Sequence, residues 1–381
     1  MNEKEFTGTI AGEIRWAMNG SYCYFHPHEL PLNINIDPRV RLSLSEAAIE
    51  LARLDGMTSK TDAEESEILL TAFTLMESAS SSSIEGTRST LDDLYRSARI
   101  EEKDVSRAKD NKEVLSYKKA LNEGFEALKK GEKISTDLIK KLHKILMSND
   151  RGSHLSPGEF KTVQNAIGTV GDTLETAKMV PACPESVDRL MDNWVKYVNS
   201  KDVETIEKVA ISHSQFESIH PFRDGNGRMG RLLVVLIIYS DGLLRSPVLY
   251  PSEYFNKHRD KYIDGLFNAA SKDAFKEWLT FFAEALRTQA AFSIRTIDRL
   301  RTYRKALTEN ENSVNIIRAI GMLFRNPYIR STDLKETLNV SAPTANLIIE
   351  HLQDRKVIRE ITGKARNRVY VADGIMEILR S

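Results

Sequence analysis

One stretch, residues 219–231, constrains what this chain can fold into more than any other part of the sequence. It lies between two segments, residues 203–219 and 232–239, in which apolar residues recur at helical spacing or run almost without interruption. Pro221 disfavours an α conformation for the residue before it, His220, so the first helix is expected to end there. The sequence therefore predicts two helices joined by a short polar turn.

The turn carries groups that suit a phosphorylated ligand. Gly225 and Gly227 allow positive φ angles and a close approach of a ligand, and the unpaired N–H groups at the start of the second helix favour an anion. Arg228 and Arg231 lie about one helical turn apart, so both guanidinium groups can reach successive phosphates. These residue types predict an anion-binding site.

Two further side chains of the turn supply chemistry. Asp224 is a hard oxygen ligand suited to Mg²⁺, which proteins usually share between a carboxylate and substrate phosphates. His220, with an unperturbed pKa near ~6.5, can accept a proton from a hydroxyl group at neutral pH. Any one of these residues could belong to an ordinary helix-connecting loop. The complete set predicts a nucleotidyl or phosphoryl transferase with a protein base.

The stretch resembles the signature of Fic-domain proteins, His-x-Phe-x-Asp/Glu-Gly-Asn-Gly-Arg-x-x-Arg, and matches it at every specified position. The resemblance implies a mainly α fold with a Fic helical core. It also implies transfer of AMP from ATP-Mg²⁺ to a Ser, Thr or Tyr hydroxyl of a target protein, with diphosphate leaving. The intact Gly-Asn-Gly pattern favours AMP transfer over the phosphorylation known in one relative of the superfamily.

The resemblance also implies a role for each residue of the turn. His220 is the base, Asp224 holds Mg²⁺, and Phe222 is a buried anchor. Asn226 and the glycine amides are expected to hold the α- and β-phosphates, and the two arginines the outer phosphates. Tyr262 is the best match to an adenine-pocket residue. The implied nucleotide contacts in the turn are Gly225, Asn226, Gly227, Arg228, Met229, Gly230 and Arg231.

A serine-rich segment upstream, residues 80–87, lies within a helical pattern and is expected to be helical rather than a linker. Ser81, Glu85 and Gly86 resemble the inhibitory motif of many Fic proteins, Ser/Thr-x-x-x-Glu-Gly/Asn. The resemblance implies that the Glu85 carboxylate pairs with Arg231 through two charge-assisted hydrogen bonds, so that ATP binds unproductively. In some such proteins the same glutamate orients water to remove AMP, so removal by Glu85 stays open.

Residues 159–168 alternate weakly and form the best β-hairpin candidate in the helical region. In Fic proteins a hairpin here, the flap, pairs with the backbone of the target, and this chain has Lys161 where the family often has arginine. Residues 1–40 are predicted to be an extended arm, and residues 151–158 a loop. His213 is expected to pack or form a hydrogen bond on its helix.

The rest of the chain predicts further helices and a separate C-terminal unit. Ser43 or Ser45 is expected to cap the first long helix, and Ser135 a later one. The last seventy residues order as helix, helix, turn, helix and hairpin, which is the order of a winged helix-turn-helix domain. The predicted domains are an N-terminal arm with the inhibitory motif, a Fic catalytic core and this unit, at residues 1–105, 106–305 and 312–381.

The partners are less constrained by the sequence. Lys and Arg together number 54, as do Asp and Glu, so no overall basic field argues for nucleic acid. The C-terminal unit could bind DNA through Ser341, Thr344 and Asn346 and a wing with Lys364, Arg366 and Arg368, or could contact protein. Self-modification and a homodimer are open. Without a signal peptide or long apolar run, the expected site is the cytoplasm, with no membrane partner and both cysteines free. A DNA-binding regulator with a nucleotide-sensing core is the alternative function.

Overall fold

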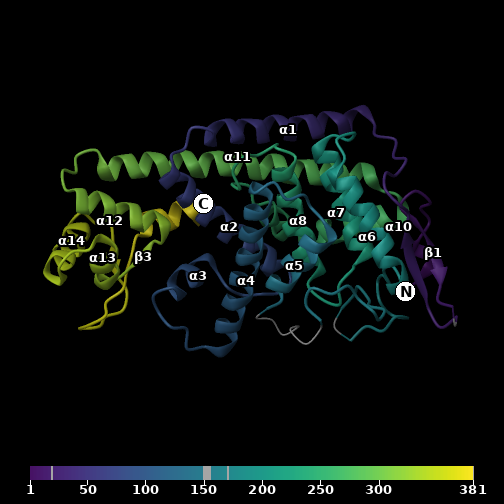
Figure 1. Ribbon diagram of the computed structural model, residues 1–381, viewed down its shortest axis with the longest axis horizontal. Helices are drawn as coiled ribbons and strands as arrows, with labels where there is room; N and C mark the ends of the chain where they lie inside the picture. Colours follow the sequence, from purple (N-terminus) through teal and green to yellow (C-terminus); the bar gives the residue numbers. More distant parts are fainter. Residues whose placement is uncertain (19, 149–155, 170, 381) are drawn as a thin grey trace.

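The computed structural model describes residues 1–18, 20–148, 156–169 and 171–380 and consists mainly of helices. Two long helices, α1 (Pro38–Thr58) and α11 (Phe275–Thr308), pack side by side along the top of the molecule in Figure 1. Asp37 caps α1, because its side chain accepts hydrogen bonds from the backbone N–H groups of the first turn. The predicted cap at Ser43 or Ser45 is wrong, since both hydroxyls donate to carbonyls inside the helix.

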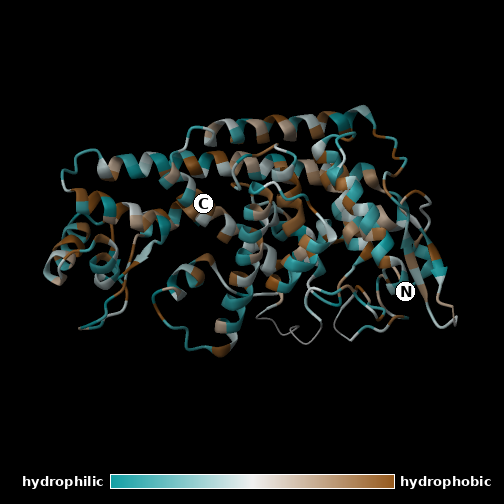
Figure 2. Ribbon diagram, in the orientation of Figure 1, coloured by the Kyte–Doolittle hydropathy of each residue, from teal (hydrophilic) through white to brown (hydrophobic). Residues whose placement is uncertain are grey.

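Helix α8 (Asn226–Ser240) lies in the core and contacts α7, α4, α2 and α5. Nearly every residue of α8 is buried, and hydrophobic colours dominate this helix in Figure 2. The predicted cap of Ser135 on α5 is confirmed by its bond to the N–H of Leu138. The elements are α2 (Ala63–Ile84), α3 (Leu91–Ser97), α4 (Val105–Lys129), α5 (Thr136–Leu146), α6 (Pro184–Asn199), α7 (Thr205–Ile219), α8 (Asn226–Ser240), α9 (Ser252–Lys257) and α10 (Arg259–Lys272).

The N-terminal segment is more ordered than an extended arm. A short 3₁₀ helix, η1 (Glu3–Glu5), precedes an antiparallel hairpin of β1 (Gly12–Trp16) and β2 (Cys23–Pro27). All five residues of β2 are buried, because this strand packs against α7. Tyr24 and Phe25 of β2 are therefore buried as part of a strand pair rather than of an extended arm.

The hairpin predicted at residues 159–168 is reduced to one bridge, between Ile167 and Met179. No residue of this segment is assigned to a strand. The side chains of Lys161 and Asn165 bond instead to the backbone that joins α7 to α8, and these bonds hold the segment without a ladder. Most of the loop predicted at residues 151–158 lies outside the described residues.

The C-terminal unit has its three predicted helices in place, and two elements that were not predicted, β3 and α15. Its short strands pair antiparallel in the order β3-β5-β4. Polar contacts join this unit to α3 and to the residues that follow it, among them Tyr328 Oη to Asp92 at 2.6 Å and Arg99 to Asp333 at 2.8 Å. The elements are α12 (Val314–Arg325), β3 (Tyr328–Ile329), α13 (Ser331–Leu338), α14 (Ala342–Asp354), β4 (Arg359–Glu360), β5 (Tyr370–Val371) and α15 (Asp373–Arg380).

Within the described ranges, no helix combines the length and the apolar composition needed to cross a bilayer. One continuous hydrophobic core runs from Ala11 near the amino end to Leu379 near the carboxyl end. The hairpin and the C-terminal unit therefore extend the core at opposite ends of the molecule in Figure 1.

Candidate active site

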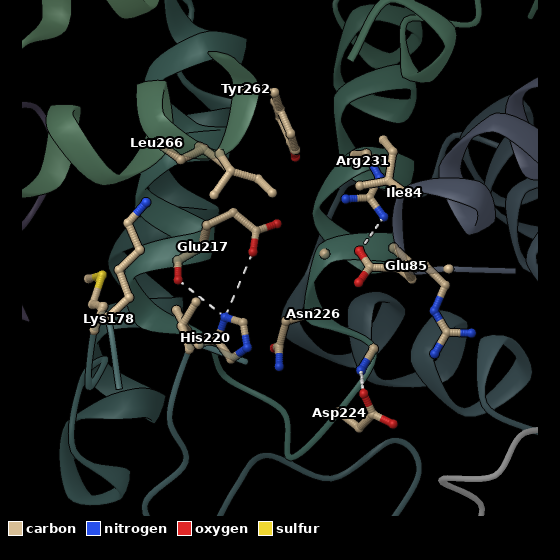
Figure 3. Close-up of a pocket in the computed structure, with 18 of the residues that line it drawn as sticks. Ile84, Glu85, Lys178, Glu217, His220, Asp224, Asn226, Arg231, Tyr262 and Leu266 are labelled. Carbon is tan, nitrogen blue, oxygen red and sulfur yellow. Dashed lines mark hydrogen bonds and ion pairs between the residues drawn. The ribbon is translucent and has the colours of Figure 1, made fainter. Parts of the chain in front are cut away.

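A pocket of about 750 Å³ opens where α2, α7, α8 and α10 meet (Figure 3). Pockets of this size commonly take small-molecule ligands. It brings together residues that lie far apart in the sequence, and the predicted site residues Ser81, Met229 and Gly230 lie outside its lining. The predicted residues that line it are Glu85, Gly86, His220, Asp224, Gly225, Asn226, Gly227, Arg228, Arg231 and Tyr262.

His220 ends α7 in the left-handed conformation, with φ 50° and ψ 59°. Its Nδ1 lies 3.3 Å from the backbone oxygen of Glu217, and because a carbonyl oxygen only accepts, Nδ1 carries the proton. That tautomer leaves Nε2 unprotonated on the pocket side (Figure 3). Burial and the nearby Lys161 charge lower the pKa of His220 to about 3, so the base form is present at neutral pH.

The turn after His220 is fixed by its own side chains. Asn226 accepts a hydrogen bond from the N–H of Phe222 and donates to its carbonyl, both at 2.8 Å. The Asn226 amide group therefore holds the turn together, and the expected contact of Asn226 with phosphate stays a prediction. Phe222 is completely buried and stacks on His143 with ring centroids 3.6 Å apart. The expectation that Phe222 is a buried anchor is confirmed.

His143 on α5 holds the turn from below. Gly158 donates its N–H to Nδ1 at 2.9 Å, so the ring proton is on Nε2, which donates to the backbone oxygen of Asp224 at 3.0 Å. Burial lowers the pKa of His143 to about 4, which keeps it neutral. No sequence pattern indicated this role, because His143 looks like any polar residue of an amphipathic helix.

Glu85 lies at the C-terminal end of α2 and points towards Arg231 on the same side of the pocket (Figure 3). Its Oε1 lies 2.6 Å from Nη2 of Arg231. Two further bonds of this arginine go to Ser81, from Nε to Oγ at 2.9 Å and from Nη2 to the carbonyl at 3.0 Å. Burial raises the pKa of Glu85, but the charge and hydrogen bond of Arg231 outweigh it and leave the pKa below its ordinary value. One carboxylate contact is present where two were expected.

The Glu85 carboxylate occupies a position suited to an anion. A Cβ added at Gly227 would lie only 2.5 Å from Glu85 Oε1, so the missing side chain admits the carboxylate to the first turn of α8. The partial positive charge of that helix end and the buried guanidinium group of Arg231 both favour negative charge there. A phosphate group would be favoured at this position for the same reason.

Arg228 also reaches the pocket but has a different partner. Its Nη1 lies 2.7 Å from Oε1 of Glu113 on α4, and that oxygen also accepts a hydrogen bond from Thr87. Arg228 and Arg231, the two arginines of α8, are therefore both held by carboxylates. Glu113 was not predicted from the sequence, because nothing in α4 distinguishes it from other surface acids.

Asp224 is exposed at the pocket rim, and its Oδ1 accepts a hydrogen bond from the N–H of Gly225 at 2.7 Å. Within the described parts of the chain, no group of three or more His, Cys, Asp or Glu residues could hold a metal ion. A single carboxylate beside an anion site suits Mg²⁺ that arrives with a phosphorylated ligand, because such Mg²⁺ takes most of its ligands from phosphates and water.

The opposite end of the pocket is more apolar, with Ile263 and Leu266 in its wall. Tyr262 contributes to the lining but is almost fully buried, and its hydroxyl lies 2.8 Å from Nε2 of His213. His213 is also stacked against Phe255. The expectation that His213 packs and forms a hydrogen bond is confirmed.

Two side chains near His220, those of Glu217 and Lys161, have positions that the sequence did not predict. Glu217 points into the pocket, with Oε2 3.7 Å from Nδ1 of His220, and burial raises its pKa to about 8. Lys161 was assigned to the flap but is buried behind the turn. A polar residue three positions before the histidine and a lysine in an alternating segment carry no signal of burial by themselves.

Two models of one family match this chain. The model described as Fic/DOC family matches residues 133–238, and the model described as Fic/DOC family N-terminal matches residues 42–126. Together they span about half of the chain. The first contains His220 and the turn that follows it, and the second contains Glu85.

Curated relatives match shorter segments. The chain is 33% identical over 128 residues to protein adenylyltransferase fic-1 of Caenorhabditis briggsae, which covers 33% of this chain and 23% of that protein. It is 38% identical over 96 residues to probable protein adenylyltransferase aq_aa38 of Aquifex aeolicus, which covers 24% of this chain and 27% of that protein. The matches therefore span only about a quarter of the length of either relative.

The fold is shared over a greater length. The crystal structure of a Fic family protein from Desulfovibrio desulfuricans G20 superimposes with a TM-score of 0.56 at 20% identity, covering 89% of this chain and 97% of the other. The fold likeness and the two family matches, which contain the His220 turn and the end of α2, lead to one conclusion: the chain belongs to the Fic/DOC family.

Proposed function

We propose that this protein is a protein adenylyltransferase, which moves AMP from ATP to a hydroxyl side chain of a target protein. The observation that carries the proposal is the pair formed by a histidine with a free Nε2 and, across the same pocket, an anion position at the start of α8 beside Arg231. The names of the related proteins, which are adenylyltransferases, support the same reaction.

In the proposed reaction the target hydroxyl gives its proton to Nε2 of His220. The hydroxyl oxygen forms a bond to the α-phosphorus of ATP, and the bond from that phosphorus to the oxygen bridging to the β-phosphate breaks. Diphosphate leaves with that oxygen. Mg²⁺, held by Asp224 and the phosphates, would neutralise the charge of the leaving group. The backbone N–H groups at Gly225–Gly227 and the two arginines would hold the phosphates.

We further propose that Glu85 inhibits this reaction. Its carboxylate lies where a phosphate group would be favoured, and Arg231 cannot give the same donor to both. While this ion pair is intact, the outer phosphates of ATP lose one guanidinium partner. ATP is then expected to bind in a pose in which the α-phosphorus does not meet the target hydroxyl.

The test is the intact mass of proteins after incubation with ATP and Mg²⁺, with the enzyme alone and with cell lysate. The Glu85→Gly variant is expected to add one AMP to itself or to a lysate protein, and the wild type less. The double variant Glu85→Gly, His220→Ala should add none. If ATP binds by calorimetry and no protein gains AMP, the proposal is wrong.

Removal of AMP is a second candidate, because Glu85 and His220 face the same pocket from opposite sides. The Glu85 carboxylate could then orient water towards the AMP–protein bond. Lysate proteins modified by the Glu85→Gly variant, freed of it and incubated with wild type provide the test. Release of AMP by wild type but not by Glu85→Gln would favour removal.

We also propose three domains, with boundaries at residues 1–105, 106–305 and 312–381, the last a winged helix-turn-helix unit. Ser341 and Asn346 are exposed at the start of α14, and the loop between β4 and β5 exposes three cations. These groups support contact with duplex DNA. Binding of labelled duplex DNA, lost when Arg366 and Arg368 are both changed to Gln, would favour that function. The cations in the loop are Lys364, Arg366 and Arg368.

A further inference from the structure

The carbonyl groups of four consecutive residues, 219–222, all accept hydrogen bonds from only two residues of the flap segment, residues 159–168. Lys161 donates its backbone N–H to the carbonyl of Pro221 at 2.8 Å and its Nζ to that of Ile219 at 3.2 Å. Asn165 donates its Nδ2 to the carbonyl of Phe222 at 2.8 Å and to that of His220 at 3.3 Å. The turn that carries His220 is thus bonded along its whole length from one side.

Lys161 and Asn165 also bond to each other, with Nζ 2.7 Å from Oδ1. Lys161 is only 3% exposed, and among the described residues no carboxylate lies within ion-pair distance of its Nζ, so its partners there are neutral oxygens. Burial lowers the pKa of Lys161 to about 7. A buried amine without a counter-ion costs stability, and a hydrophobic side chain would fill the same space at lower cost.

His220 itself needs such support. A residue with a Cβ rarely adopts a φ near 50°, and backbone strain of this kind persists only where the surrounding structure over-determines it. Without bonds to the carbonyls on either side, the turn would relax towards a more favourable conformation. The Nε2 atom would then lose its aim at the pocket.

We propose that Lys161 and Asn165 are positioning residues, which hold the turn at residues 219–222 in its left-handed conformation and so keep Nε2 of His220 directed at the reacting hydroxyl. The inference rests on the proposed adenylyl transfer. In this proposal the flap segment supports the enzyme's own turn, whereas the family resemblance implied only that it pairs with the backbone of the target.

Charge acts in the same arrangement. Burial lowers the pKa of His220, and the Lys161 ammonium group lowers it further, while Glu85 on α2 raises it. The Glu217 carboxyl group on α7 lies on the Nδ1 side, and Cys183 is the other titratable group near Lys161. Removal of the Lys161 charge should therefore raise the pKa of His220, but only in part, because burial is the larger cause.

The activity test compares Lys161→Met, Lys161→Arg and Asn165→Ala, each combined with Glu85→Gly so that inhibition does not mask the result. Lys161→Met should lower the rate of AMP transfer at saturating ATP by about 100-fold, which is the cost of displacing a catalytic group by about 1 Å. The KM for ATP should be unchanged, since neither residue lines the pocket. Lys161→Arg should retain most of the rate of its Glu85→Gly parent, because a guanidinium group can donate to the same carbonyls.

Lys141→Met is the matched control, because Lys141 is an exposed lysine of α5 that pairs with Glu123 outside the pocket. It should leave the rate unchanged. If Lys161→Met does not fold, Asn165→Ala decides the question. This substitution removes the hydrogen bond to the carbonyl of His220, while the carbonyl of Phe222 keeps its bond from Asn226. A rate for Asn165→Ala equal to that of its parent would overturn the inference.

A second readout does not need the reaction. NMR of labelled histidine, with the His220 signal assigned by its loss in His220→Ala, should show its pKa above about 3 in Lys161→Met and little changed in Lys161→Arg. An unchanged pKa and unchanged Nδ1–H tautomer in Lys161→Met would overturn the inference. Absence of AMP transfer from Glu85→Gly itself, with the NMR shift present, would refute the proposed function and leave the positioning role supported.

Discussion

Two turns face each other across the pocket and differ in how many bonds hold them. The catalytic turn, residues 219–225, is bonded through its carbonyls to Lys161, Asn165 and His143 and is largely buried. The proposed inhibitory turn, residues 82–86, reaches Arg231 of α8 through Glu85, whose side chain is 41% exposed. It accepts side-chain bonds from Arg259 and Asn256, and a Cβ added at Gly86 would meet open space.

The difference teaches where each task is placed. A side chain that accepts a proton must be positioned to within a fraction of an ångström, so it is expected on a turn that many hydrogen bonds hold in one conformation. An inhibitory carboxylate that competes with a phosphate group must be displaceable. The proposed inhibitor, Glu85, is accordingly a partly exposed side chain whose ion pair with Arg231 a phosphate group can replace. The stem of the inhibitory helix is nonetheless firm, because Glu77 in its middle bonds to Tyr117 on α4 and Ser252 on α9.

The largest effect is expected on the well-bonded side. His220→Ala, in the Glu85→Gly background, should lower AMP transfer by about 10³-fold, within the range of a general base. The rate of AMP incorporation measures it, with ATP binding followed separately by calorimetry. His351→Ala, which changes a histidine bonded to Glu311 in the C-terminal unit, should have no effect. Full activity of His220→Ala would remove the distinction between the two turns.

On the weakly bonded side, Glu85→Gly should raise the rate of AMP transfer. A hydrogen bond between charged groups contributes about 1.5–3 kcal/mol, or about 10-fold to 100-fold in an equilibrium constant. The exposure of Glu85 places the expected increase near the lower end, because solvent screens the pair. Glu67→Gly, at an exposed glutamate of the same helix outside the pocket, controls for weakening of α2. Equal activation by both variants would assign inhibition to the helix rather than to the carboxylate.

Ser81→Ala should have a smaller effect in the same direction. It removes the hydroxyl that accepts from Nε of Arg231 and leaves the Glu85 contact in place. A bond of about 0.5–1.5 kcal/mol predicts an increase of about 2-fold to 10-fold in the rate of AMP transfer, below that of Glu85→Gly. Activation equal to that of Glu85→Gly would show that the serine carries as much of the inhibition as the glutamate.

The smallest effect concerns the stem of α2. Burial raises the pKa of Glu77 to about 7, above its unfolded value of 4.5. Its contribution to folding is therefore complete below pH 4.5 and is lost as the pH rises to about 7. The midpoint temperature of thermal unfolding should therefore fall less for Glu77→Gln than for wild type as the pH rises through that window, by on the order of a few °C. Parallel curves for the two proteins would contradict a charged, buried Glu77 above pH 7.

Much of the arrangement follows from local sequence. The helix end at His220, the turn that buries Phe222 and the helical course of the serine run are encoded within a few residues of each position. The pairing of Glu85 with Arg231 came from resemblance, since the two lie 146 positions apart. The roles of Lys161, Asn165 and His143 arise from contacts between distant segments, which no local pattern specifies. The N-terminal hairpin was missed because its strand β2 is buried on both faces and does not alternate.

Gly227 limits which substitutions could relieve the proposed inhibition by Glu85. A methyl group there would exclude the Glu85 carboxylate, but it would equally obstruct the proposed phosphate position. If Glu85 inhibits as proposed, a substitution at Gly227 is therefore expected to weaken inhibition and substrate binding together. Substitutions that free the enzyme while preserving its chemistry are expected to lie on α2, so selection can alter the strength of inhibition there without disturbing the reaction.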